Sequence, residues 1–372
     1  MKFGIIFELS VPRPFENGVE KMVFDNSLEQ ARLADELGFE SAWCVEHHFL
    51  EEYSHSSCPE MFLSACAATT KDIRLGFGIA TCVPALNHAV RLAERGAFLD
   101  VLSGGRVEFG TGRSSTWTEL GGFGAAVDDT KRSWDEYVRA FPKMWTQERF
   151  SHEGQSFSMP ERAILPKPVQ DPHPPMWVAV TAPGTEIEAA ERGMGCLLLS
   201  VGNVAKNKPR FDKYRETIKN CTPVGHTVND RIAVMNWLYC DEDQDEAVKY
   251  GEIFINTFSS MAAQAIEISQ AVPSDSYKAI GLLGNLRTDP DDGQMRKKVP
   301  GGLCVGTPED IIQTVQEWKD AGADQIIFMV NAREVLEQDK VLKSMRLFAE
   351  KVMPHFEDEG DNVVEMRARA AG

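Results

Sequence analysis

The sequence predicts a (β/α)8 barrel, in which eight parallel strands alternate with helices. About eight short apolar runs alternate with segments of helical periodicity. The chain has 372 residues, a length that one barrel with insertions in its βα loops can reach. No G-x-G-x-x-G motif opens the helix after the first apolar run, which disfavours the alternative, an open doubly wound sheet.

The strand–helix units follow one another along most of the chain. The first consists of an apolar run at 2–9 and, after the turn-rich VPRPFENG, a helix at 25–37. The other strands are predicted in FESAWCVEHHF, IRLGFGIATCVP, RVEFGTGR, MWVAVTA, CLLLSVG, RIAVMNWLYC and DQIIFMV. The other helices are predicted near 59–70, 87–101, 130–145, 184–192, 208–219, 243–255, 308–320 and 334–351.

Two stretches interrupt this alternation. Residues 146–175 are polar and proline-rich, and residues 261–302 contain the turn-rich LGNLRTDPDDGQ. We interpret both as insertions with little regular structure, placed after the fourth and seventh strands where they could serve as lids. Residues 1–355 are therefore assigned to a single barrel domain, and residues 356–372 are expected to be a frayed C-terminal tail.

The composition of the chain indicates where the protein works and which binding partners are not expected. The net charge of −17 repels nucleic acid and anionic lipid, so neither is expected as a partner. The eight cysteines form no C-x-x-C pair or zinc-ligand spacing, which favours a reduced, cytoplasmic protein without a metal. The N-terminus lacks the apolar core of a signal peptide, and no apolar run is long enough for a membrane span.

The most informative polar cluster follows the second predicted strand. Glu46, His47 and His48 lie at the end of a barrel strand, where active sites of this fold are built. Histidine titrates near neutral pH and can manage protons. Strand alternation with small Ala42 and Cys44 in the lumen would place Glu46 and His48 inward and His47 outward, unless the chain bends after Glu46. The alternative is that these are surface histidines without a role.

A candidate phosphate site follows the fourth and fifth strands. The glycine-rich run FGTGRSST brings Arg113 and Ser114 to the end of the fourth strand, which suits an anion. The neighbouring run TAPGTE offers the hydroxyls of Thr181 and Thr185 beside a helix that begins near Gly184. The alternative for each run is an ordinary turn with a solvated arginine.

The third predicted strand is rich in small residues. The run GFGIATCV contains Ala80 and Thr81, and such residues allow a flat ring to lie against the backbone. A tightly packed barrel strand would have the same composition.

Together these motifs resemble the bacterial-luciferase-like flavin-dependent monooxygenases. The likeness runs in order through MKFG, GFESAWCVEHHF, IRLGFGIATCVP, LDVLSGGRVEFGTGR, MWVAVTAPGTEIEAAERG and VGTPEDIIQTVQEWKDAGADQIIF. It implies a (β/α)8 barrel that binds reduced FMN, delivered by a separate flavin reductase, and activates dioxygen with it.

The resemblance also implies roles for individual residues. His47 matches the histidine important in flavin oxygenation, with Glu46 beside it and His48 in support. The region of Ala80 and Thr81 matches the backbone under the flavin ring, whereas Arg113, Ser114, Thr181, Gly184 and Thr185 match the phosphate site.

Two departures limit what the resemblance implies. The luciferase proper has a reactive cysteine where this chain has Gly112, and a carboxylate where it has Thr181. Light emission from a long-chain aldehyde is therefore not expected here.

We therefore predict a monooxygenase that oxygenates a small organic substrate with reduced FMN and dioxygen, and that forms a homo- or heterodimer. One alternative is a deazaflavin-dependent dehydrogenase on the same fold. The other is a non-catalytic flavin-binding partner subunit, disfavoured because Glu46, His47, His48 and Arg113 are all present.

Overall fold

The computed structural model describes residues 1–114, 116–199, 204–269, 274 and 301–357. The expected tail at 356–372 and the expected insertion at 261–302 lie for the most part outside the described residues. The described residues 261–269 are helical, so the insertion was expected to begin too early.

Eight parallel strands close into a barrel. They pair in the order β1, β2, β3, β4, β7, β8, β9 and β11, and β11 pairs with β1 to complete the ring. Their bounds are β1 (Lys2–Phe7), β2 (Ser41–Cys44), β3 (Arg74–Thr81), β4 (Val107–Gly112), β7 (Met176–Val180), β8 (Gly195–Leu199), β9 (Ile232–Cys240) and β11 (Gln325–Met329). The predicted (β/α)8 fold is thereby confirmed, and each strand falls in a segment predicted from apolar runs.

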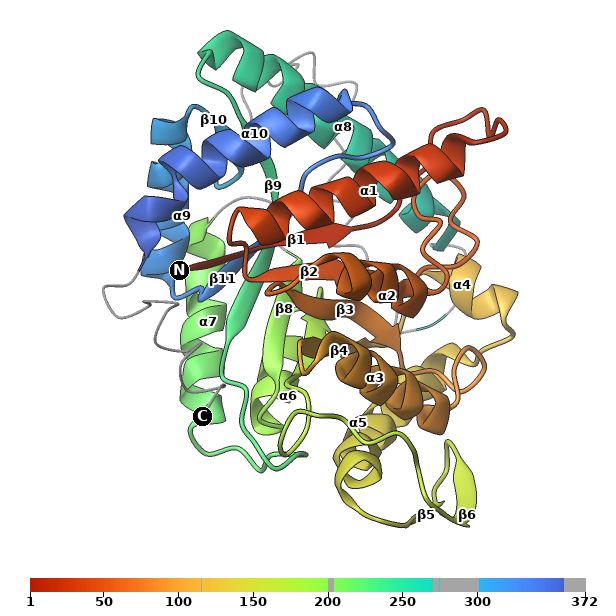
Figure 1. Ribbon diagram of the computed structural model, residues 1–372. Coiled ribbons are helices and arrows are strands. Elements are labelled where there is room, and N and C mark those ends of the chain that lie inside the picture. Colours follow the sequence, from red (N-terminus) through yellow and green to blue (C-terminus); the bar gives the residue numbers. More distant parts are fainter. Residues whose placement is uncertain (115, 200–203, 270–273, 275–300, 358–372) are drawn as a thin grey trace.

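Helices surround these strands (Figure 1). They are α1 (Val19–Glu36), α2 (Pro59–Thr69), α3 (Ala89–Ser103), α5 (Thr130–Thr146), α6 (Thr185–Glu191), α7 (Val204–Ile218), α8 (Gln244–Ser269), α9 (Pro308–Ala321) and α10 (Gln338–Lys351). Helix α1 begins before the predicted residue 25. It starts directly after Gly18, which adopts a left-handed conformation with a φ of 95° at the N-cap position. Among the described residues, no helix combines the length and apolar character needed to cross a membrane.

Short elements were not predicted from the sequence. They are α4 (Trp117–Gly122), the strand β10 (Cys304–Gly306), which pairs with the end of β9, and the 3₁₀ turns η1 (Val127–Asp129) and η3 (Met353–Phe356).

Within 146–175 the strands β5 (Phe150–Glu153) and β6 (Ser158–Arg162) form an antiparallel hairpin, which projects beside α5 in Figure 1. The expectation of little regular structure there is wrong in part, because contacts within the hairpin and with the preceding helix α5 hold it. His152 stacks on Phe157 at 4.2 Å, and its Nε2 lies 2.8 Å from Glu136 Oε1 on α5.

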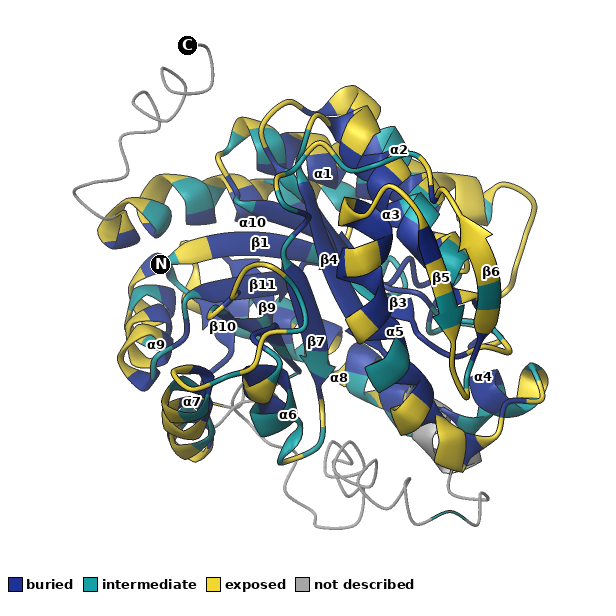
Figure 2. Cartoon of the chain, turned by 90° about the horizontal axis from the view of Figure 1, so that it is seen from below, coloured by how far each residue is buried: buried dark blue, intermediate teal, exposed yellow. Residues whose placement is uncertain are grey.

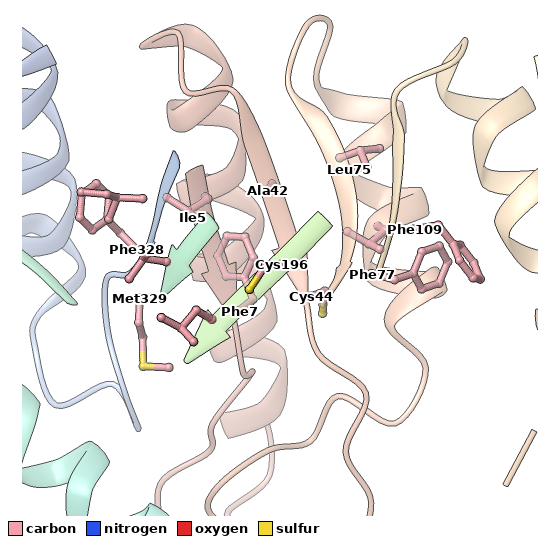
Figure 3. Packing of buried hydrophobic residues seen from close by; sticks show 14 of the residues in the cluster. Ile5, Phe7, Ala42, Cys44, Leu75, Phe77, Phe109, Cys196, Phe328 and Met329 are labelled. Carbon is pink, nitrogen blue, oxygen red and sulfur yellow. The ribbon is translucent and has the colours of Figure 1, made fainter. Parts of the chain in front are cut away.

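The main apolar core lies between the strands and the helices. Figure 2 shows buried strands inside helices whose outer faces are exposed. Figure 3 shows that Ala42 and Cys44 belong to this layer, with Leu75 and Phe77 of the next strand. The expectation that Ala42 and Cys44 face the lumen is therefore wrong.

The lumen instead contains Trp43 of β2 and Trp177 of β7. Their rings meet edge to face, with centroids 5.6 Å apart. Gly76 of β3 makes room for Trp43, because a Cβ there would overlap the indole ring. A large ring beside a glycine can fill the lumen of a barrel just as well as a set of small residues can. The small size of Ala42 and Cys44 therefore did not indicate which side of the strand faces the lumen.

A buried carboxylate, Glu108, fills the lumen near the amino ends of the strands. Glu108 of β4 accepts hydrogen bonds from the indole Nε1 of Trp177 at 2.6 Å and from Arg231 Nη2 at 3.1 Å, and it also pairs with Arg74. The Arg231 guanidinium lies 4.7 Å from the centre of the Trp177 ring. The lumen is therefore packed at this level.

Candidate active site

A cavity opens at the carboxyl ends of the barrel strands. Its apolar floor includes Ile6, Trp43, Ala233, Met235 and Ile327. Further apolar residues and nine polar ones line the wall, the polar ones being Glu8, Glu46, His47, Tyr53, Arg113, Ser114, Thr181, Thr185 and Glu188. The cavity thus brings together residues predicted from three separate strand ends.

His47 lies between two carboxylates in this cavity. Its Nδ1 donates to Glu119 Oε1 at 2.9 Å, and its Nε2 lies 3.7 Å from Glu8 Oε2. Burial opposes the charged imidazolium, but the charges of Glu119 and Glu8 outweigh it and raise the pKa of His47 to about 9. His47 therefore carries a positive charge at neutral pH.

Strand alternation left open whether His47 or His48 faces the cavity, and the structure places His47 there. Trp43 points into the lumen, so Val45 and His47, at the same phase, also line the cavity. The count of strand phase that pointed His47 outward unless the chain bends is wrong at its start, because Trp43, and not Ala42 or Cys44, faces the lumen. His48 is not among the residues that line the cavity; its ring packs edge to face on Phe123 at 4.9 Å.

Glu46 joins the ends of β2 and β3. Its Oε2 accepts from the backbone N–H of Thr81 at 2.7 Å, and its Oε1 accepts from Asn87 Nδ2 at 2.7 Å. His48 Nε2 lies 3.3 Å from the same Oε1. Both carboxylate oxygens are thus engaged within the protein, which fits a role in positioning the strand ends.

Ala80 and Thr81 lie just behind the cavity wall. Both are buried, and the residues of β3 that line the cavity are their neighbours Gly78 and Ile79. The register between β3 and β4 shifts between Phe77 and Ala80. The irregularity falls at Gly78 and Ile79, the two residues of β3 that line the cavity.

Arg113 extends from the end of β4 into the cavity wall. Its Nη1 donates to Thr130 Oγ1 at 3.3 Å, and no carboxylate of the described residues pairs with it. Ser114 follows in the left-handed region with a φ of 65° and donates to Glu119 Oε2 at 2.8 Å. Among the described residues, the cavity therefore holds a guanidinium without a carboxylate partner.

The second half of the predicted phosphate site follows β7, the strand that pairs with β4. Thr181 and Thr185 both line the wall, and Gly184, with a φ of 95°, precedes the first residue of α6. The Gly184 N–H donates to Glu186 Oε2 at 3.0 Å. The side chain of Glu188 also lines this region, and its charge is paired with Lys131 at 2.5 Å.

The residues missed by the sequence analysis include three ionisable neighbours of His47: Glu8, Tyr53 and Glu119. Glu8 follows β1, so a search of every strand end would have found it. Glu119 belongs to α4 and reaches His47 across 72 positions of sequence, a contact for which no local pattern exists. Within the described residues, no group of His, Cys, Asp and Glu is arranged to hold a metal ion.

The closed barrel thus brings His47 and Arg113 to one cavity at the carboxyl ends of its strands. Residues 1–325 match the family model described as luciferase-like monooxygenase, and the chain belongs to this family. The family predicted from the sequence motifs is therefore confirmed.

Several characterised proteins are similar over nearly the whole chain. The oxygenase component of a flavin-dependent trigonelline monooxygenase from Acinetobacter baylyi is 24% identical, covering 96% of each chain. The solved structure of monooxygenase RslO1 from Streptomyces bottropensis is 29% identical with a TM-score of 0.76, covering 96% of this chain and 100% of that one.

Two further structures are alike in fold. The oxygenating constituent of 3,6-diketocamphane monooxygenase from Pseudomonas putida, solved with FMN, has a TM-score of 0.74 at 21% identity, covering 95% of this chain and 98% of that one. The coenzyme F420-dependent tetrahydromethanopterin reductase from Methanopyrus kandleri has a TM-score of 0.67 at 19% identity, covering 96% and 99%.

Proposed function

We propose that the chain is a monooxygenase that uses reduced FMN and dioxygen to oxygenate a small organic substrate. The observation that carries this proposal is one cavity in which a charged histidine, His47, lines the same space as Arg113, an arginine that no carboxylate of the described residues neutralises. Membership of the luciferase-like monooxygenase family supports the reaction class.

The residues present suit FMN on two grounds. The guanidinium of Arg113 and the hydroxyls of Thr181 and Thr185 form a donor set for a phosphate, and no described carboxylate pairs with Arg113. The floor beneath is apolar and contains Trp43 and Met235, which suits a flat, largely apolar ring system. We assign the phosphate to Arg113, Ser114, Thr181, Gly184 and Thr185, and the ring to the segment of β3 near Ala80 and Thr81.

FMN, when bound and reduced, supplies the electrons that activate dioxygen. The protein provides position, charge and protons. The apolar floor excludes water, and the cationic His47 stabilises negative charge that develops beside its Nε2. Glu119 fixes the ring by holding Nδ1–H, so Nε2 is the atom that can deliver or recover a proton.

Glu46 and His48 act at one remove from the reacting atoms. Glu46 holds the backbone of Thr81 and His48 packs behind it, so both maintain the cavity wall. We further propose that a separate reductase supplies reduced FMN, as the oxygenase-component relative suggests, that the protein works in the cytoplasm, and that it forms a homo- or heterodimer.

Oxygen uptake tests this function. The purified protein is mixed anaerobically with photoreduced FMN, then with oxygen and a panel of small organic substrates, and oxygenated product is measured by mass spectrometry with ¹⁸O₂. We expect label in the product and weaker FMN binding in Arg113→Ala. Hydride transfer from a reduced deazaflavin, without oxygen uptake, would instead identify the dehydrogenase alternative, which the F420-dependent fold neighbour favours.

A further inference from the structure

Glu8 is a buried carboxyl group with one oxygen that the protein does not satisfy. It follows β1, is 6% exposed and lines the cavity. Its Oε1 accepts from the hydroxyl of Tyr53 at 3.4 Å, whereas its Oε2 receives no hydrogen bond from the described residues. A buried carboxylate oxygen without a donor is costly, so the position suits an atom that exchanges protons with a ligand.

The two carboxyl groups beside His47 differ sharply in environment. Glu119 accepts hydrogen bonds from His47 Nδ1, the His48 N–H, Ser114 Oγ and Thr116 Oγ1 at 2.6–3.1 Å. These donors and the charge of His47 outweigh the effect of burial and lower the pKa of Glu119. Glu119 therefore remains ionised and fixes the imidazolium, while Glu8 is free to change its protonation state.

Burial dominates at Glu8. It raises the pKa of this carboxyl to about 7, although the charge of His47 and the hydrogen bond from Tyr53 oppose the rise, and the charge of Glu119 adds to it. The other side of Glu8 faces a small hollow lined by Arg333 and Glu334. Two neighbouring groups in the cavity thus differ in how readily they lose a proton. His47 keeps its proton at neutral pH, whereas the carboxyl group of Glu8 can release one.

We propose that Glu8 is a catalytic acid–base residue, whose Oε2 exchanges a proton with the bound substrate or with water formed beside it, in partnership with His47 Nε2. This proposal rests on the proposed monooxygenase function and adds a residue to it. The position of Oε2, 3.7 Å from His47 Nε2 and on the cavity wall, is within reach of an atom bound between them.

The proton balance follows from the overall reaction. One atom of dioxygen enters the product and the other leaves as water, so protons must reach the departing oxygen. When protonated Glu8 donates, its O–H bond breaks, the electron pair stays on Oε2, and a new O–H bond forms on the acceptor oxygen. The carboxylate so formed is held beside the positive His47 and is protonated again from solvent through the open cavity.

The test begins with the protonation state itself. Infrared difference spectra between pH 5.5 and 8.5 would be recorded on the full-length protein without cofactor. We expect a protonated-carboxyl C=O band that disappears near pH 7, that is lost in Glu8→Gln, and that persists in Glu334→Gln. Glu334 is a suitable control because it is another carboxyl group whose pKa burial raises, close to Glu8 but outside the cavity wall.

The second measurement is turnover with saturating reduced FMN. We expect kcat of Glu8→Gln to fall by about 100- to 10,000-fold, the usual cost of losing an acid–base group, with FMN affinity unchanged. Glu8→Asp, which keeps the carboxyl group, should recover part of the rate and shift its pH profile. If Glu8→Gln does not fold, the Asp variant and the wild-type infrared titration still decide.

Absence of a neutral-pH carboxyl titration that depends on Glu8 overturns the proposal, whatever the turnover. A normal titration with a wild-type kcat and pH profile in Glu8→Gln overturns it as well, because the proton would then play no part in the reaction. If the wild type gives no oxygenated product, the proposed function fails, and the infrared titration separately decides whether Glu8 exchanges a proton at neutral pH.

Discussion

Replacing Glu119 by Gln should lower the pKa of His47 in the folded protein and thereby remove the stability that its positive charge provides. The isosteric amide can still meet the hydroxyls of Ser114 and Thr116, which can donate or accept, but the negative charge beside His47 Nδ1 is lost. Burial, the largest influence on His47, then prevails. We expect the pKa of His47 to fall from about 9 toward or below its ordinary value of 6.5.

The magnitude follows from the raised pKa. A rise from 6.5 to about 9 corresponds to about 3 kcal/mol of stability, at about 1.4 kcal/mol per pKa unit. A raised histidine pKa stabilises the folded protein fully below pH 6.5, and this stabilisation is lost as the pH rises through about 9. Glu119→Gln should therefore cost up to about 3 kcal/mol more at pH 6 than at pH 10.

Urea unfolding at the two pH values measures this difference, and NMR of ¹³C-labelled histidine gives the pKa of His47 directly. Glu161→Gln is the control, because its ion pair with Arg149 is exposed and contributes little. An equal loss of stability at pH 6 and pH 10, or a His47 pKa still near 9 in the variant, would refute the reasoning.

Three further predictions concern the cofactor, the chemistry and the barrel. Arg113→Ala should weaken FMN binding about tenfold or more, because a charge-assisted hydrogen bond contributes about 1.5–3 kcal/mol; fluorescence titration checks this, with the exposed Arg132→Ala as control. His47→Ala should still bind FMN but lose about 100- to 10,000-fold in oxygen transfer, with oxygen reduced to hydrogen peroxide instead. His48→Ala should also lose oxygen transfer, but less, because the His48 ring does not line the cavity. Assays of product and of hydrogen peroxide distinguish the two variants. Gly110→Ala should destabilise the barrel by at least about 1–3 kcal/mol in urea, since its Cβ would overlap the backbone oxygen of Phe77; wild-type stability would contradict that contact.

Much of the fold could be predicted because barrel strands are local apolar runs. The helices around them repeat at a period that the sequence displays. The direction of each strand's side chains was harder to predict, since Trp43 fills the lumen only because Gly76 of the next strand yields space. That complementarity joins two strands and leaves no mark on either segment alone.

The candidate site divides in the same way. Arg113 and Thr181 could be predicted to share one cavity, because strand ends meet at one mouth of a barrel. The partners of His47 could not all be predicted. Glu119 approaches from a short helix of the loop after β4, and Tyr53 approaches Glu8 from the loop after β2, so their roles depend on how loops fold back over the barrel.

The tryptophans around the cavity give the protein a built-in optical probe. Trp43 and Trp134 line the cavity, and Trp177 lies edge to face with Trp43 just below it. Oxidised flavins absorb in the region where tryptophan emits, so a flavin bound in this cavity would quench the emission of these residues by energy transfer. Ligand arrival and departure could then be followed in real time in the unlabelled protein, and Trp43→Phe would show how much of the signal originates at the cavity floor.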